Sequence, residues 1–177
     1  MTLLRQSIET YIHAKDGNRP HLMARAFTGD AVLVMEVKTQ EIAFPETVKG
    51  VGAMADVLVS QFAQRYENIY TLCMGAPPDG ETSFICSWFV CMTEKGSGAT
   101  RVGLGGYEWV SADRSGKVSR LRITIEEMKT LPGEVSEAVL EWVDALPYPW
   151  CPHDQPARTA PAIPAVQDIA RRLAARQ

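Results

Sequence analysis

Several features that define large protein classes are missing from this sequence. No apolar run approaches the roughly 20 residues that a membrane-spanning helix needs, and the N-terminal segment meets a polar residue every three or four positions, unlike a secretion signal. The net charge is only −3, and the 18 Lys and Arg residues are scattered along the chain. These absences predict a cytoplasmic protein with no nucleic acid and no membrane among its partners.

The sequence also lacks the spacings that hold metals and cofactors. The cysteines form no C-x-x-C pair and are Cys73, Cys86, Cys91 and Cys151. Three of them lie in apolar, strand-like stretches, where a thiol packs as a small hydrophobe. The CPHD motif at 151–154 has no second cluster to complete a tetrahedral zinc site. We therefore expect reduced core cysteines, no metal and no cofactor.

The 177 residues, 46% of them hydrophobic, are enough for one globular domain with an appendage. The chain begins with an amphipathic pattern at i, i+4, i+7 and i+8, formed by Leu4, Ile8, Tyr11 and Ile12. This pattern predicts a helix that ends near Asp16, with Thr2 as a candidate N-cap and Tyr11 on the buried side.

Shorter elements are expected next. Residues 20–27 predict a short helix opened by Pro20. The apolar runs 31–35 and 42–44 predict two short strands, and residues 50–65 carry a third helical stripe.

Four long strands follow the predicted helices. They cover 68–74, 84–93, 101–110 and 118–127, and turn-forming residues separate them. Three helices followed by four consecutive strands predict an α+β domain with an antiparallel sheet. Glycines at 103, 105 and 106 interrupt the third of these strands, which indicates a bulge or a strong bend.

The C-terminal segment has a different character. Residues 135–146 repeat apolar side chains with helical spacing, the Pro-rich linker 147–164 predicts no regular structure, and 166–173 form a last amphipathic stripe. We expect this last helix to dock on its own domain or on a partner subunit, with Asp168 paired to Arg172. The predicted organisation is a domain at 1–131 and a helical extension at 132–177.

This order of elements resembles the NTF2-like superfamily, which includes ketosteroid isomerase, scytalone dehydratase and the SnoaL-like polyketide cyclases. The resemblance covers about Leu4 to Leu131, and its local markers are Tyr11-Ile12 with Asp16-Gly17, Phe27-Thr-Gly-Asp-Ala31, Gly50 and Ser115-Gly-Lys-Val118. It implies a cystatin-like α+β cone, in which a curved antiparallel sheet wraps around the N-terminal helices and leaves a ligand pocket at its open end. Many members are homodimers that pair through the outer face of the sheet.

The resemblance also implies two catalytic hydrogen-bond donors. Tyr11 resembles the tyrosine of the first helix in the isomerases, and Glu108 resembles their acidic oxyanion donor. Met35 takes the place of their aspartate base, while Glu36 beside it should face the other way in a regular strand. Steroid isomerisation therefore needs a bulge that turns Glu36 inward.

Glu108 shares one face of its strand with otherwise apolar or glycine positions: Val102, Leu104, Gly106 and Val110. A buried glutamate without a partner is rare, so three interpretations stay open. Glu108 faces the pocket, or it is neutralised across the sheet by Arg101, Arg120 or Arg122, or its row of side chains lies on the other face of the sheet. Tyr11 has its own alternative as a core tyrosine bonded to a backbone carbonyl.

The predicted function is the binding of a small apolar or aromatic molecule, with Trp88, Met35, Phe62 and Tyr107 as ligand contacts. The activity considered is cofactor-free isomerisation, dehydration or cyclisation, with Glu108 and Tyr11 as donors. The alternative is a non-catalytic dimeric binding or interaction domain with a filled cone and a last helix that docks on the partner.

Overall fold

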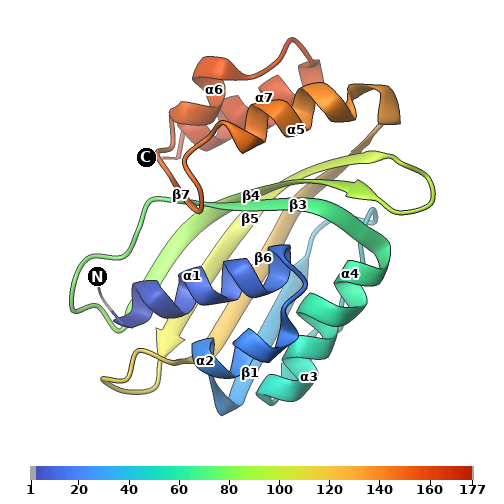
Figure 1. Cartoon of the computed structure of the whole chain (residues 1–177). Helices are drawn as coiled ribbons and strands as arrows, with labels where there is room; N and C mark the ends of the chain where they lie inside the picture. Colours follow the sequence, from blue (N-terminus) through green and yellow to red (C-terminus); the bar gives the residue numbers. More distant parts are fainter. Residues whose placement is uncertain (1–2, 177) are drawn as a thin grey trace.

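The computed structural model describes residues 3–176, in which a seven-stranded sheet separates two groups of helices (Figure 1). The strand order is β2-β1-β6-β5-β4-β3-β7. The strands are β1 (Phe27–Val37), β2 (Thr47–Lys49), β3 (Tyr66–Met74), β4 (Ser83–Glu94), β5 (Thr100–Ser111), β6 (Val118–Leu131) and β7 (Trp150–Cys151). The sheet is mixed, because β1 runs parallel to β6 and β7 runs parallel to β3. The α+β cone is confirmed, although the sheet is not antiparallel throughout.

Helices cover both faces of this sheet (Figure 1). On the concave face lie α1 (Leu3–Asp16), η1 (Pro20–Leu22), α2 (Met23–Ala26), α3 (Val51–Ala55), the π-helical turn η2 (Asp56–Ser60) and α4 (Gln61–Arg65). On the other face lie η3 (Gly133–Val135), α5 (Ser136–Asp144), α6 (Gln155–Thr159) and α7 (Pro164–Ala174). The predicted helices are confirmed, and the predicted N-cap, Thr2, lies outside the described residues.

One predicted strand, 42–44, is wrong. This segment belongs to the irregular connection between β1 and β2, and the strand itself forms at Thr47–Lys49. Ile42 is buried and packs with Phe44 against the core. The apolar run therefore covers the core with its side chains instead of joining the sheet through its backbone, a distinction that hydrophobicity alone does not make.

The Pro-rich linker 147–164 is also more regular than predicted. Its residues Trp150–Cys151 form β7, which lies along the edge of β3, and Cys73 N–H donates to Pro149 O at 2.7 Å. Gln155–Thr159 form the short helix α6, in whose first turn a proline is tolerated. Edge strands and first helical turns are the two regular positions that accept proline readily.

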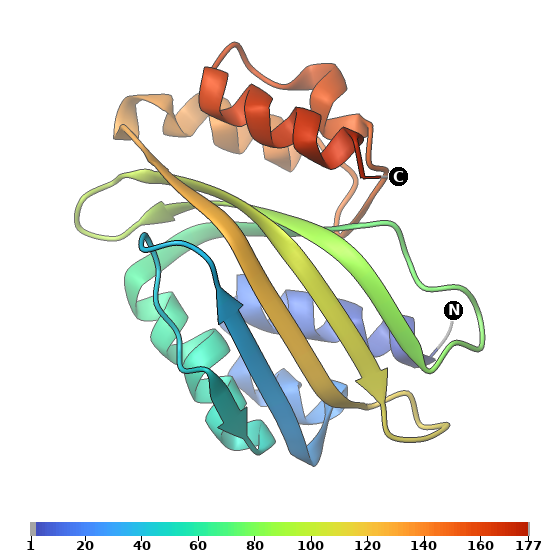
Figure 2. The same ribbon diagram turned by 180° about the vertical axis from the view of Figure 1, so that it is seen from behind.

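The molecule has two hydrophobic clusters, one on each side of the sheet. The larger lies between the sheet and the N-terminal helices and includes Ile8, Tyr11 and Trp109. In the second, α5 and α7 pack on the outer face of β3, β4 and β5, where Trp142 stacks near Phe89 with 5.8 Å between ring centroids. Figure 2 shows this helical layer across one end of the sheet, while the other end of the outer face stays uncovered. The last helix thus docks on its own chain.

The four cysteines are buried and free, as predicted. Among the described helices, none is long and apolar enough to cross a membrane.

Candidate functional site

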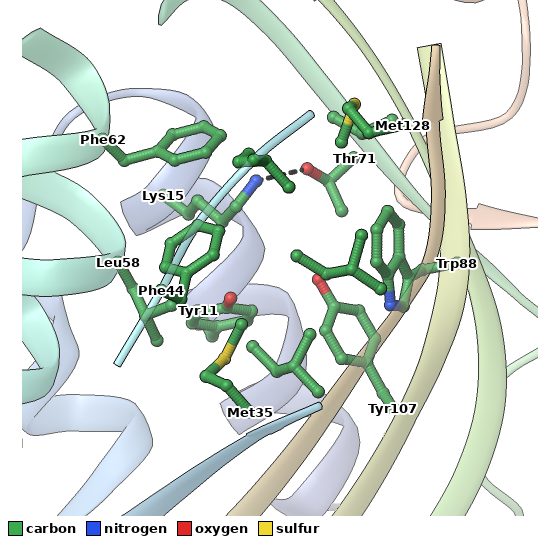
Figure 3. A pocket seen from close by; sticks show the side chains of 14 residues that line it. Tyr11, Lys15, Met35, Phe44, Leu58, Phe62, Thr71, Trp88, Tyr107 and Met128 are labelled. Atoms are coloured by element: carbon green, nitrogen blue, oxygen red, sulfur yellow. Dashed lines mark hydrogen bonds between the residues drawn. The ribbon is translucent and has the colours of Figure 1, made fainter. Parts of the chain in front are cut away.

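A cavity lies inside the cone, between the concave face of the sheet and the first helix (Figure 3). Its walls come from α1, η2, α4, five strands of the sheet and the connection 38–46. The cavity volume is about 30 Å³. The cavity is therefore narrow, and most of the side chains that line it are apolar.

The structure brings five predicted site residues together in this cavity. Tyr11, Met35, Phe62, Trp88 and Tyr107 all contribute to its walls, although they come from five different elements. Their role in ligand binding stays a prediction.

Glu108 lies outside the cavity, so the prediction that it faces the pocket is wrong. Its side chain is 50% exposed on the outer face of β5, and its Oε2 lies 3.3 Å from Nε of Arg122. Arg122 also holds Glu36, with 2.6 Å between Nη2 and Oε2. Glu108 therefore belongs to a solvated ion cluster, one of the alternatives left open by the sequence.

The sequence grouped the side chains of β5 on one face correctly, but that face lies on the outer side of the sheet and not on the pocket side. Val102 and Leu104 do share a face with Glu108, but that face is the outer one, where α5 and α7 bury the apolar pair. Apolar side chains on β5 therefore reflect a second helical layer. Glu36 also faces outward, as predicted for a regular strand, because the irregularity in β1 lies between Phe27 and Val32.

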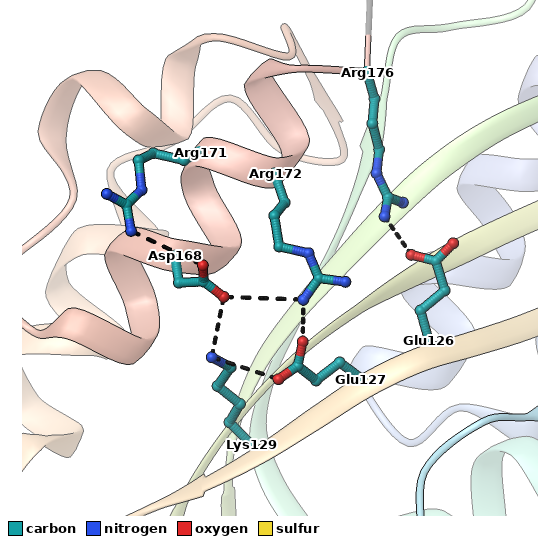
Figure 4. A network of polar contacts seen from close by, with 7 residues as sticks. All are labelled: Glu126, Glu127, Lys129, Asp168, Arg171, Arg172 and Arg176. Atoms are coloured by element: carbon teal, nitrogen blue, oxygen red, sulfur yellow. Dashed lines mark hydrogen bonds and ion pairs between the residues drawn. The ribbon is translucent and has the colours of Figure 1, made fainter.

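Ion pairs hold the outer helical layer on β6 (Figure 4). Arg172 pairs with Glu127, and Arg176 pairs with Glu126. Nζ of Lys129 lies 3.2 Å from Oδ2 of Asp168. The predicted pair of Asp168 with Arg172 is confirmed at 3.9 Å. These contacts fix α7 on the outer face, remote from the cavity.

Tyr11 is the central polar group of the cavity wall. Its ring is fully buried and packs edge-on against Phe27 and Trp109, with centroid distances of 5.7 and 5.4 Å. Its hydroxyl makes no hydrogen bond of normal geometry among the described residues, but the nearby Tyr107 hydroxyl acts on it as a hydrogen-bond partner, which lowers the pKa of Tyr11 and partly offsets the effect of burial. Burial raises the pKa of Tyr11 above its ordinary value, so the group stays a neutral donor.

Trp88 and Tyr107 form the opposite wall. The Trp88 Nε1–H donates to Gly106 O at 3.1 Å, and the Trp88 and Tyr107 rings lie 5.8 Å apart. The indole packs directly over Gly105, where β6 carries one extra residue and the strand pairing shifts. The glycine cluster therefore marks a bulge, as the sequence predicted, and makes room for the indole.

Lys15 is a cavity residue that the sequence analysis missed. Its side chain is only 10% exposed, and its Nζ donates to Thr71 Oγ1 at 2.9 Å and lies 4.5 Å from the centroid of Phe62. Burial lowers the pKa of Lys15, because the ammonium loses its hydration, while the neighbouring Asp16 opposes this shift.

Asp16 is held behind Lys15 by three hydrogen bonds. It accepts from Thr71 N at 2.7 Å, from Thr71 Oγ1 at 2.8 Å and from the Tyr148 hydroxyl at 2.8 Å. Its Oδ1 lies 3.7 Å from Nζ of Lys15. Burial raises the pKa of Asp16, and Lys15 and these hydrogen bonds oppose the shift.

A signal for Lys15 was present in the sequence. Lys15 follows Tyr11 by four residues, so the two side chains lie on the same face of α1. Lys15 is also eleven residues after Leu4, so it continues the helical spacing of the buried residues of α1. A lysine on a buried helical stripe is unusual enough to indicate a functional or ion-paired role.

No group of three or more His, Cys, Asp or Glu side chains that could hold a metal ion occurs among residues 3–176.

This chain resembles known proteins in its structure and not in its sequence. No family model and no curated protein sequence matches it. RV0760c from Mycobacterium tuberculosis, in complex with estradiol-17beta-hemisuccinate, has a TM-score of 0.56 and 12% identity, covering 70% of this chain and 93% of that one. An LEH-like epoxide hydrolase from M. tuberculosis has a TM-score of 0.51 and 13% identity, covering 70% and 82%.

A third similar structure is an NTF2-like protein from Burkholderia xenovorans. It has a TM-score of 0.52 and 14% identity, and the match covers 76% of this chain and 95% of that one. Identities this low establish the fold and not the activity. The chain has the NTF2-like fold, which confirms the resemblance drawn from its sequence.

Proposed function

We propose that this chain binds a small apolar or aromatic molecule in the cone cavity, with a ligand oxygen accepting a hydrogen bond from Tyr11. The observation that carries the proposal is the Tyr11 hydroxyl, which is fully buried on the cavity wall and makes no hydrogen bond of normal geometry among the described residues. A buried donor left unsatisfied costs about 1–3 kcal/mol. A ligand oxygen would remove that cost.

Neighbours with the same fold support a small-molecule role. The M. tuberculosis protein RV0760c was solved with estradiol-17beta-hemisuccinate, and a computationally designed protein of this fold binds 17-OHP. The cavity volume of about 30 Å³ is well below the roughly 300–1,000 Å³ typical of ligand pockets, so binding requires the cavity walls to move apart. A ligand with one aromatic ring needs less of this widening than a steroid does.

We expect a ligand to enter by displacing the segment 38–46, which contributes Ile42 and Phe44 to the cavity wall. This segment has no regular structure and is held at Glu41. Arg101 Nη1 donates to Glu41 O at 2.9 Å, and Thr130 Oγ1 donates to Glu41 Oε2 at 2.8 Å. Backbone hydrogen bonds also hold its two ends, from Lys38 N to Ile125 O and from Met35 N to Glu46 O. Between these ends the segment has no strand pairing, which makes it the part of the wall that we expect to open.

A catalytic version of the proposal, such as cofactor-free isomerisation, dehydration or cyclisation, cannot use Glu108. The donor that remains is Tyr11, and the base available at the cavity is Lys15 in its neutral form. Both side chains come from α1, so the geometry offers one donor and one amine to the same ligand.

The test compares two ligands of similar shape by thermal shift. Methyl benzoate carries an acceptor oxygen, whereas isopropylbenzene does not. Wild type should bind methyl benzoate more tightly, and Tyr11→Phe should reduce that preference about tenfold, the equivalent of one hydrogen bond. Tyr66→Phe is the matched control, because the Tyr66 hydroxyl is also buried without a partner but does not line the cavity. Equal preference in wild type and Tyr11→Phe would contradict the proposal.

The alternative is a non-catalytic dimeric binding or interaction domain with a filled cone. The observation that favours it is the narrowness of the cavity, where Met35, Phe44, Phe62 and Met128 leave little room. A dimer that pairs through the outer face would use its uncovered end, near Glu108 and Ile85, because α5 and α7 occupy the rest. No response to either ligand, together with a dimeric mass by light scattering, would support this alternative. The homodimer and the cytoplasmic location stay predictions.

A further inference from the structure

Lys15 places a primary amine at an apolar cavity. The amine lies at the end of α1, 4.5 Å from the centroid of Phe62 and 2.9 Å from Thr71 Oγ1. Figure 3 shows the Lys15 amine and the hydroxyls of Tyr11 and Tyr107 on the walls of one cavity. Binding an apolar molecule does not require a buried amine, so its presence indicates an additional role.

Thr71 connects this amine to a carboxylate. Nζ of Lys15 donates to Thr71 Oγ1, and Thr71 Oγ1 in turn donates to Asp16 Oδ1 at 2.8 Å. The hydrogen of the Thr71 hydroxyl is therefore committed to Asp16, and an oxygen lone pair faces the amine. This arrangement forms a path along which a proton can pass from Lys15 to Asp16.

The electrostatics of the pair favour such a transfer. Burial lowers the pKa of Lys15 and raises the pKa of Asp16, so both shifts favour the uncharged forms. The other titratable groups around Lys15 are Tyr11, Tyr107 and the buried thiol of Cys73. All three stay neutral, because burial raises the pKa of both tyrosines, and a hydrogen bond with Cys86, together with burial, raises the pKa of Cys73. Asp16 is therefore the group that exchanges a proton with the amine.

We propose that Lys15 is a nucleophile that condenses reversibly with an apolar aldehyde or ketone in the cavity and forms an imine. This inference rests on the proposed function and names the substrate class of the same site. Tyr11, four residues earlier on α1, would donate its hydroxyl hydrogen bond to the carbonyl oxygen.

The chemistry balances within the residues of the site. Lys15 first transfers one proton through Thr71 to Asp16, and its lone pair then forms the N–C bond while the carbonyl π electrons move to oxygen. A second proton passes from nitrogen to that oxygen and gives a carbinolamine. The C–O bond then breaks, the oxygen leaves as water with the proton held by Asp16, and the nitrogen lone pair forms the C=N bond. The products are a protonated imine, one water molecule and the Asp16 carboxylate.

The experiment is reductive trapping on the full-length protein. Benzaldehyde and cyanoborohydride are added at pH 7, and peptide mapping by mass spectrometry locates the benzyl group among the six lysines of the chain. Lys95 is the matched control, because it is exposed and its Nζ also donates to one acceptor, Ala63 O at 2.7 Å. Burial lowers the pKa of Lys15, so a larger fraction of its amine is neutral and nucleophilic. We expect Lys15 to be labelled faster than Lys95.

Two variants test the mechanism. Lys15→Met should lose the fast labelling and keep the slow labelling of Lys95. Thr71→Val should slow the labelling of Lys15 and move its pH profile towards that of Lys95, because the connection to Asp16 is broken. An unchanged pH profile in Thr71→Val would overturn the role of Thr71.

The outcome is separable from that of the proposed function. Methyl benzoate is an ester and does not form an imine with lysine, so its thermal shift reports binding alone. A thermal shift with methyl benzoate, combined with labelling of Lys15 no faster than Lys95, would overturn the imine proposal and leave ligand binding intact. If neither the thermal shift nor the fast labelling of Lys15 is observed, ligand binding and imine formation are both overturned. Because the labelling is mapped on wild type, the conclusion does not depend on the folding of any variant.

Discussion

Two neighbouring glycines of β5 should respond in opposite ways to the same substitution. A Cβ atom at Gly105 would lie 1.9 Å from Thr124 O and 2.6 Å from the Trp88 ring. Real Cβ contacts are essentially never shorter than 3.0 Å, and the nearest obstacle is backbone. At Gly106 the nearest atom to a Cβ would be Cys86 O at 3.8 Å, an ordinary contact.

The expected magnitudes follow from these distances. Gly105→Ala must force β5 from β6 or displace the indole, and overpacking of this kind costs about 1–3 kcal/mol. Gly106→Ala meets no obstacle, and it restricts the unfolded chain, which stabilises a compatible site by about 0.4–1 kcal/mol. The difference in free energy of unfolding between the two variants should therefore be about 1.5–4 kcal/mol.

Urea unfolding of wild type and both variants measures this difference directly. The wild-type curve is the reference, and the adjacent positions in one strand control for the general effect of alanine in a sheet. If both variants unfold within about 0.5 kcal/mol of each other, the packing of Trp88 on Gly105 is not what requires glycine there.

Three further predictions concern single side chains. Tyr11→Phe should unfold at no lower urea concentration than wild type, whereas Tyr148→Phe should lose about 1 kcal/mol because its hydroxyl donates to Asp16. A hydrogen bond from Lys129 lowers the pKa of Asp168. The contribution of Asp168 to the free energy of unfolding is therefore present above about pH 3.9 and is lost as the pH falls below that value. The stability difference between wild type and Asp168→Asn, measured by urea unfolding, should thus be constant from pH 7 to about pH 4 and should shrink as the pH falls further. Finally, Glu108→Gln should leave the affinity for methyl benzoate unchanged in a titration, since Glu108 faces solvent outside the cavity; a loss of affinity would contradict this placement.

The regular spacing of apolar residues predicted most helices and strands, because each of these elements buries only one of its faces. The stripe from Leu4 to Ile12 fixes the inner face of α1, and Tyr11 lies on it in the structure. The cavity-lining positions of Met35, Trp88 and Tyr107 were also predictable once the fold was recognised.

The errors occur where one pattern has two physical explanations. Val102 and Leu104 are buried by the C-terminal helices, so an apolar row on β5 does not identify the pocket side. Ile42 is buried by side-chain packing without a strand. Lys15 was missed because charged residues are normally assigned to the surface. Its burial is tolerable because it contacts Asp16, the next residue, and Thr71, which lies 56 residues further along the chain.

The most direct measurement of the central claim is an NMR titration of methyl benzoate into protein labelled with ¹³C at the methionine methyl groups. Met35 and Met128 line the cone cavity, while Met54 is fully buried in the same core without lining it. The account predicts saturable shifts of the Met35 and Met128 signals, with contacts to the ligand ring, and an unchanged Met54 signal. Signals that stay unchanged at all three residues, or that move equally at all three, would contradict a ligand site inside the cone.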